Sequence, residues 1–217
     1  MTTPIVSAQL FFLYDNHCPW SYAVTPLINE LTTAFPDIEL HLWHTAFFDG
    51  KSDNNAKSKK VELDKVEELA NISFSSAYQK TLEQQANSIL SANLMTWAQN
   101  KTPNLALPLL NALQQAHFQQ GNTLANQSDF DDIIATLKIS PPAKIFKNKL
   151  NNDVLIQLEE IFALQEIIAT EAIPALLLAI DDELILLNHN FYLIEPKAII
   201  DAVQLEFNKH HLNSKKK

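Results

Sequence analysis

The fold is decided by residues 10–22, which read Leu10-Phe11-Phe12-Leu13-Tyr14-Asp15-Asn16-His17-Cys18-Pro19-Trp20-Ser21-Tyr22. The apolar run at the start of this stretch predicts a buried β-strand. A helical pattern follows, and its apolar residues share one stripe that comprises Val24, Leu27, Ile28, Leu31 and Phe35. Cys18, the only cysteine of the chain, therefore lies where a strand ends and a helix begins.

This position favours a reactive thiol at Cys18. Backbone N–H groups are unpaired in the first turn of a helix, and the helix dipole stabilises an anion there. Pro19 fits because the first helical residue needs no N–H donor. We therefore expect a depressed pKa for Cys18, in the range of about 3.5–7.5. The alternative is that a lone cysteine is merely a small buried hydrophobe.

The composition indicates an intracellular globular protein. The chain has 217 residues, of which 47% are hydrophobic, so it suits one domain or one domain with a large insertion. A single cysteine cannot form an internal disulfide, which fits a reducing cytoplasm. No apolar run approaches the ~20 residues that span a bilayer, and Met1-Thr2-Thr3-Pro4 does not open a signal peptide. We expect a cytoplasmic protein with no membrane partner.

Charge and glycine content exclude several classes of ligand. The net charge is −9, and all 16 basic residues are lysines, which argues against a nucleic-acid partner. Two glycines are too few for a dinucleotide fingerprint or a P-loop. His41 and His44 lie three apart on an expected strand and face opposite sides, so we expect no metal site. No carboxylates form a recognisable acid–base pair.

The first half of the chain predicts a βαβ unit followed by helices. Strands are expected at 9–14 and from 38 to about 47, with a helix at 19–35 between them, so the two strands should be parallel. The polar stretch 51–60 is interpreted as a solvated linker. Residues 61 to about 137 show helical patterns only.

The last third returns to mixed structure. A helix is expected from 152 or 153 to about 169, a buried strand at 175–180, a turn at Asp181-Asp182, a hairpin strand at 183–187 and a helix from Pro196 to about 209. The polar tail beyond 209 is expected to fray. The fold class is thus α/β, a thioredoxin-like core (βαβ, then ββα) with an all-helical insertion after the second strand. Its expected domains are 1–50 with 141–217, and 61–140.

Three features together carry a family resemblance. His17-Cys18-Pro19-Trp20-Ser21 follows the first strand, a helical insertion follows the second, and Ile173-Pro174 precedes the third. This layout resembles the DsbA-like branch of the thioredoxin superfamily, and within it the cytoplasmic FrnE-like group. Residues 116–121 and 129–130 look like the helix pair that closes the family's insert. Hydroxychromene-carboxylate isomerases and kappa-class glutathione transferases are similar in layout.

The resemblance implies roles for several residues. Cys18 would be the attacking nucleophile, and Pro174 would follow a cis peptide bond and stand opposite the thiol. Ile173 would offer its backbone to an extended peptide or to glutathione, as in strand addition. His17 next to the thiol is either a charge that stabilises the thiolate or an exposed loop residue. Trp20 is either a substrate contact or a residue that merely covers the site. His117 and Phe118 either line a groove between the insert and the core or pack in the core.

Ser21 departs from the family pattern, because redox members usually carry a second, resolving cysteine there. Serine cannot resolve a mixed disulfide, although its hydroxyl can donate a hydrogen bond to the Cys18 thiolate one turn away. A one-cysteine site needs an external thiol to release its product, and glutathione is the cytoplasmic candidate.

Three functions remain open at this point. The leading one is a monothiol thiol–disulfide oxidoreductase, similar to protein-disulfide isomerases, with Cys18 and Ser21 in the catalytic site. Its partners would be a disulfide-containing peptide or protein, or glutathione as co-substrate, with no tightly bound cofactor. The alternatives are a glutathione-dependent isomerase or transferase and a non-catalytic peptide-binding module.

Overall fold

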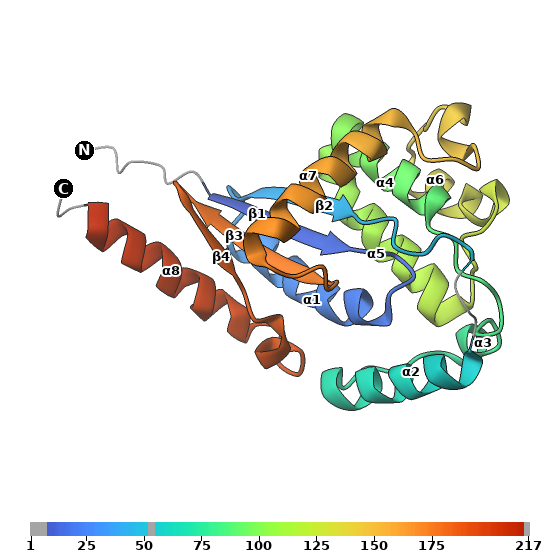
Figure 1. Ribbon diagram of the computed structural model, residues 1–217, viewed down its shortest axis with the longest axis horizontal. Helices are drawn as coiled ribbons and strands as arrows, with labels where there is room; N and C mark the ends of the chain where they lie inside the picture. The colour runs from blue at the N-terminus through green and yellow to red at the C-terminus, as the bar shows by residue number, and fades with distance from the viewer. Residues whose placement is uncertain (1–7, 52–54, 215–217) are drawn as a thin grey trace.

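A computed structural model describes residues 8–51 and 55–214, with side chains up to His210. Figure 1 shows a central sheet with helices on both faces and a group of further helices at one end. The expected absence of a signal peptide at residues 1–4 lies outside the described residues. The last helix continues to Ser214, so the tail expected to fray from residue 210 is helical at its start.

The sheet has four strands in the order β2-β1-β3-β4. They are β1 (Ala8–Tyr14), β2 (Glu39–His44), β3 (Ala175–Ile180) and β4 (Glu183–Leu186). β1 pairs with β2 in parallel and with β3 antiparallel, and β4 is antiparallel to β3. This is the expected α/β thioredoxin-like arrangement, and β1, which carries the Cys18 loop at its end, is a central strand.

Alternating side chains of β1 pack against helices on both faces. Leu10, Phe12 and Tyr14 belong to the main core, which α1 (Pro19–Ala34) and α8 (Ala198–Ser214) cover. Leu13 instead packs with Ile161 of α7 (Asn152–Ile168) on the other face. Figure 1 shows α7 over the sheet, with α1 and α8 on its other side. Period-two alternation in a strand buried on both faces explains the continuous apolar run at its sequence.

The segment between β2 and α7 is helical, as the sequence predicts. It comprises α2 (Ala56–Ala70), α3 (Ser76–Gln79), α4 (Ile89–Lys101), α5 (Pro103–Gln120) and α6 (Asp131–Leu137), with the short 3-10 turns η1 (Gln127–Asp129) and η2 (Ala143–Phe146). A third such turn, η3 (His189–Tyr192), precedes α8. One hydrophobic core joins these helices to the sheet. Figure 1 places α2 and α3 beyond one end of the sheet, next to the end of α1.

The prediction of a linker at 51–60 is wrong for the second half of that stretch. α2 begins at Ala56, because the Asn55 side chain caps it by accepting hydrogen bonds from the N–H groups of Lys57 and Ser58. The first turns of α2 are rich in lysine and serine and carry no apolar stripe, which hid the helix from pattern analysis. Within the described residues, no helix combines the length and the apolar character needed to cross a membrane.

Candidate functional site

Cys18 is the N-cap residue of α1, at the end of a tight turn that leaves β1. Its backbone N–H donates a 3.1 Å hydrogen bond to the carbonyl oxygen of Asp15, and its own carbonyl accepts one from Tyr22 at 3.1 Å. Pro19 occupies the first helical turn, where its missing N–H costs nothing. The structure therefore places Cys18 where the sequence predicts it, at the start of a helix that follows a buried strand.

The thiol itself is enclosed. Cys18 is only 6% exposed, and burial raises the pKa of its thiol to about 11. Hydrogen bonds from Ser21 act in the opposite direction, while the negative charges of Asp15 and Glu62 raise the pKa further. The expected depressed pKa is therefore wrong for this state of the protein, because desolvation of the thiolate outweighs the helix N-terminus.

Asp15 is a fully buried carboxylate in the same turn. Its two oxygens accept hydrogen bonds from the N–H groups of His17 at 2.8 Å and Phe47 at 2.9 Å. Burial alone would raise the pKa of Asp15, but His44 and His17, with a hydrogen bond from Ser88, hold it well below its usual range. Asp15 is therefore ionised at neutral pH and stabilises the turn that carries Cys18.

His17 is buried, which excludes the exposed-loop alternative. Its Nδ1 lies 3.4 Å from an Asp15 carboxylate oxygen and 3.2 Å from the Ser88 hydroxyl. Its Nε2 lies 3.2 Å from the carbonyl oxygen of Thr123. Because Ser88 and Thr123 belong to the helical insert, His17 ties the Cys18 turn to that insert.

Two further buried histidines surround this turn. Burial lowers the pKa of His44 to about 4 and that of His117 to about 3, so both are neutral at neutral pH. Nδ1 of His117 lies 2.6 Å from the carbonyl oxygen of Asn122, which fixes it as the donor. The two rings therefore act as hydrogen-bonding groups and not as charges for a thiolate.

A pocket opens beside the turn, between the core and the insert. His17 and Pro19, on either side of Cys18, form one wall. The other residues around it come from the insert and the segment before it: Phe48, Lys59, Glu62, Leu63, Tyr78, Thr81, Leu82, Gln84, Gln85, Ala86, His117, Thr123 and Ala125. The insert therefore faces the Cys18 side of the core, as expected from its position in the sequence.

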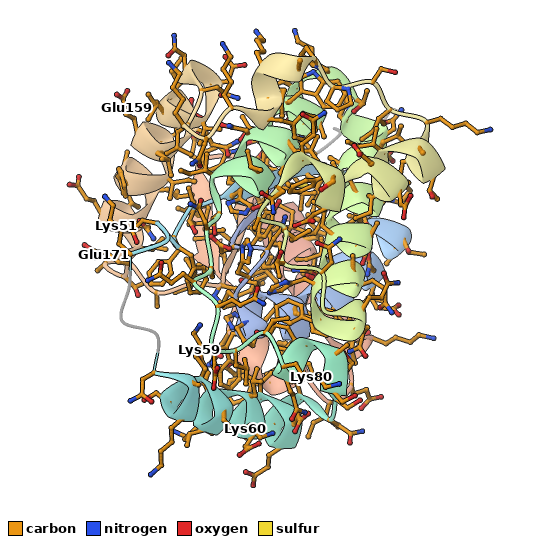
Figure 2. All side chains as sticks on the ribbon, turned by 90° about the vertical axis from the view of Figure 1, so that its right-hand side faces the viewer. Lys51, Lys59, Lys60, Lys80, Glu159 and Glu171 are labelled. Carbon is orange, nitrogen blue, oxygen red and sulfur yellow. The ribbon has the colours of Figure 1, made fainter. Side chains whose placement is uncertain are left out.

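Lys59 is the only cation among the pocket's described lining residues, apart from histidines. Its ammonium group donates 3.0 Å hydrogen bonds to the carbonyl oxygens of Leu82 and Gln84. Figure 2 shows the side chain reaching from α2 toward the body of the molecule. An ammonium group has three donors, so one remains for a ligand carboxylate.

Ile173 and Pro174 lie at the same end of the sheet as Cys18. The bond between them is cis. The paired register of β1 and β3 ends at Leu13 and Ala175, so Pro174 comes one residue beyond this pair and beside the turn that follows β1. Pro174 is buried, and Ile173 is partly exposed.

Phe118 is not where a substrate residue would be. It is fully buried, and its ring packs against Tyr22, Phe74 and Tyr78. The expected substrate contact is corrected here to a core residue, because the inward side of α5 points into this aromatic cluster. Trp20 is partly buried against the same main core and does not line the pocket.

Pattern analysis missed three residues that the structure brings to the site. Asp15 lies between the apolar run that ends at Tyr14 and Cys18, and a carboxylate in that position is a local signal. Lys59 and Glu62 lie more than 40 residues further along the chain. No local signal connects them to Cys18, since only the packing of α2 places them at the pocket.

The fold and the site define a class. A thioredoxin-like sheet presents one cysteine at the start of α1, beside a cis-proline and under a helical insert. The family model described as "DSBA-like thioredoxin domain" matches residues 9–159. The chain belongs to this DsbA-like family.

Solved structures agree on the fold. The cytosolic disulfide reductase DsbM from Pseudomonas aeruginosa superposes with a TM-score of 0.81 at 18% identity, over 92% of this chain and 98% of that one. The structure of DsbM with GSH gives a TM-score of 0.78 at the same identity, over 92% and 99%. A candidate protein disulfide isomerase from Nitrosomonas europaea gives 0.72 at 13% identity, over 92% and 98%. No curated protein matches the chain by sequence.

Proposed function

We propose that this chain is a cytoplasmic monothiol thiol–disulfide oxidoreductase in which Cys18 is the nucleophile and glutathione releases the product. The observation that carries the proposal is the place of the only cysteine at the N-terminus of α1, next to a pocket that His17 and Pro19 line. Ser21 stands where a resolving thiol would be needed, so an external thiol must complete the cycle.

The chemistry has three thiol–disulfide exchange steps. The Cys18 thiolate attacks one sulfur of a disulfide, forms a mixed disulfide with it and expels the other sulfur as a thiol after protonation. Glutathione thiolate then attacks the substrate sulfur of that mixed disulfide and releases Cys18. A second glutathione reduces the resulting glutathione-mixed disulfide and leaves oxidised glutathione. Each substrate disulfide is thus reduced by two glutathione molecules.

The pocket's composition supports a small thiol as one partner. It lies against the residues that flank Cys18, and the Lys59 ammonium at its edge can pair with a carboxylate. Glutathione is a short peptide with two carboxylates, and a structure of DsbM was determined with GSH. Ile173, before Pro174, is partly exposed, and its backbone is the proposed contact for the extended part of either substrate.

The enclosed thiol favours one alternative. A Cys18 that is protonated at neutral pH can donate a hydrogen bond to the thiolate of bound glutathione instead of attacking a disulfide. The protein would then be a glutathione-dependent isomerase or transferase that acts on a small electrophile.

Turnover measurements separate the two candidates. We expect the wild-type protein to reduce hydroxyethyl disulfide with glutathione as the only reductant, and Cys18→Ser to lose this activity. An inactive wild type, or a Cys18→Ser variant as active as the wild type, would overturn the oxidoreductase proposal. Conjugation of glutathione to chlorodinitrobenzene that survives in Cys18→Ser would support the transferase instead.

A further inference from the structure

Two carboxylates act on Cys18, and their environments differ. Asp15 is fully buried, and its pKa is held well below the usual range. Glu62 on α2 is half-buried, and burial raises its pKa while Lys65 opposes the shift. When their environments make the pKa values of two carboxylates differ in this way, the carboxylate with the raised pKa is suited to carry a proton.

Asp15 is unsuited to proton transfer. Both of its oxygens already accept backbone hydrogen bonds, from His17 and from Phe47. It is also fully buried and does not line the pocket. Its carboxylate therefore has a structural role.

Glu62 faces the pocket. It lines the same cavity as His17 and Pro19, the two residues on either side of Cys18. Lys59, one helical turn earlier, lines the cavity too, so one face of α2 is turned toward it. Among the described residues that line this pocket, Glu62 is the only carboxylate.

The reaction at this site needs a proton carrier. Cys18 starts as a protonated, buried thiol, so its proton must go to an acceptor before the sulfur attacks. The departing sulfur then becomes a thiolate in a partly buried pocket, which costs free energy unless that thiolate is protonated. One carboxylate at the pocket wall can serve both steps.

We propose that Glu62 is the general acid–base of this site, taking the proton of Cys18 and delivering it to the departing sulfur. The inference rests on the proposed oxidoreductase function. In the first half-reaction, the thiol proton moves to Glu62, the new sulfur–sulfur bond forms as the old one breaks, and Glu62 returns the proton to the leaving sulfur. In the second half, glutathione gives its proton to Glu62 and Cys18 receives it on release.

Other charged or titratable groups surround Glu62. The charge of Lys65 on α2 lowers the pKa of Glu62. The charge of Glu62 in turn raises the pKa of Tyr78 on α3 and that of Cys18. The remaining titratable groups of the pocket wall are Lys59, His17 and His117.

Glu62→Gln tests the proposal through two neutral disulfides that differ in their leaving groups. Dithiodipyridine expels an aromatic sulfur that leaves without help, whereas hydroxyethyl disulfide expels an aliphatic thiolate that needs a proton. The first step is followed by the intact mass of the reduced protein mixed with excess disulfide at neutral pH. We expect Glu62→Gln to slow the aliphatic reaction on the order of 100-fold relative to the aromatic one.

The ratio of the two rates distinguishes proton transfer from other roles. If Glu62 only keeps the thiol protonated by its charge, both reactions accelerate together in Glu62→Gln. If it only supports the fold, both slow together. Either result overturns the proposal. Glu62→Asp, which keeps a carboxylate, should restore part of the ratio, and Glu68→Gln on the exposed side of α2 should leave both rates unchanged.

Failure of the inference is distinguishable from failure of the proposed function. A wild-type protein that forms no mixed disulfide with either reagent overturns the oxidoreductase function, and the role of Glu62 with it. A wild type that reacts with both reagents, beside a Glu62→Gln variant with an unchanged ratio, overturns the role of Glu62 alone.

Discussion

The N–H of Cys18 donates a 3.1 Å hydrogen bond to the carbonyl oxygen of Asp15, so one tight turn holds the thiol and a fully buried carboxylate. The Asp15 carboxylate accepts hydrogen bonds from the N–H groups of His17 and of Phe47, which lies in the segment after β2. Asp15 therefore links the turn to the segment after β2, and its negative charge raises the pKa of the Cys18 thiol.

Asp15→Asn should destabilise the protein by about 1–3 kcal/mol, because a buried ionised acceptor loses part of its hydrogen bonding. The folded pKa of Asp15 lies below its unfolded value of about 3.9, so its stabilisation is present above that value and is lost as the pH falls through the folded pKa. Urea unfolding as a function of pH measures this. The variant should lose stability less steeply below pH ~4 than the wild type.

One result would contradict the role of Asp15. A variant whose stability has the same acid dependence as the wild type would show that Asp15 is not the ionised group. His44 and His117 also lose their stabilisation as the pH falls, but from their unfolded value near 6.5. Their contribution therefore begins at higher pH and can be separated.

The alkylation rate of Cys18 in the free protein should keep rising with pH beyond the free-thiol value of about 8.5, toward about 11. The raised pKa also means that the protonated thiol stabilises the folded state below the unfolded pKa, and that this contribution is lost as the pH rises toward the folded one. Cys18→Ala should lack this loss. Half-maximal alkylation below pH ~7.5 would instead show that the helix N-terminus outweighs burial.

Ser21→Cys should convert the protein into a dithiol enzyme. Position 21 is fully buried one helical turn from the thiol, and the hydroxyl there already bonds to Cys18. A thiol at 21 would attack the Cys18 mixed disulfide within the molecule, at high effective concentration. With a dithiol reductant and no glutathione, the variant should reduce disulfides faster than the wild type. Equal rates would show that Ser21 does not limit the wild-type site.

Lys59→Met should raise the KM for glutathione about tenfold with little change in kcat, since one charge-assisted contact is worth roughly 1.5–3 kcal/mol before screening. The Lys60→Met variant is the matched control. Lys60 is the next residue on α2 and pairs with Asp64 outside the pocket, and Figure 2 labels both lysines. Equal KM values for Lys59→Met and the wild type would remove Lys59 from the glutathione site.

The sequence was most informative where the signals are local. The structure has three features that local signals predict. The apolar run up to Tyr14 predicts a strand, the Cys18-Pro19 pair predicts the start of a helix, and the Ile173-Pro174 pair predicts the start of the third strand. The chemical state of the thiol could not be predicted, because burial of Cys18 depends on helices that are distant in sequence. Phe118 was misassigned for the same reason.

The pocket residues show the other limit. Glu62 and Lys59 belong to a helix whose start is polar and was interpreted as a linker. Their side chains matter only because α2 packs beside α1. Periodicity along the chain cannot reveal which face of such a helix meets a site that another segment forms.

The most direct test of the central claim is the intact mass of the reduced protein after incubation with oxidised glutathione at neutral pH. We expect the addition of one glutathione, attached at Cys18 and removed again by excess reduced glutathione. Cys18→Ser, the matched control, should gain none. A wild-type protein that stays unmodified, while its denatured form is readily glutathionylated, would contradict the claim that Cys18 attacks disulfides.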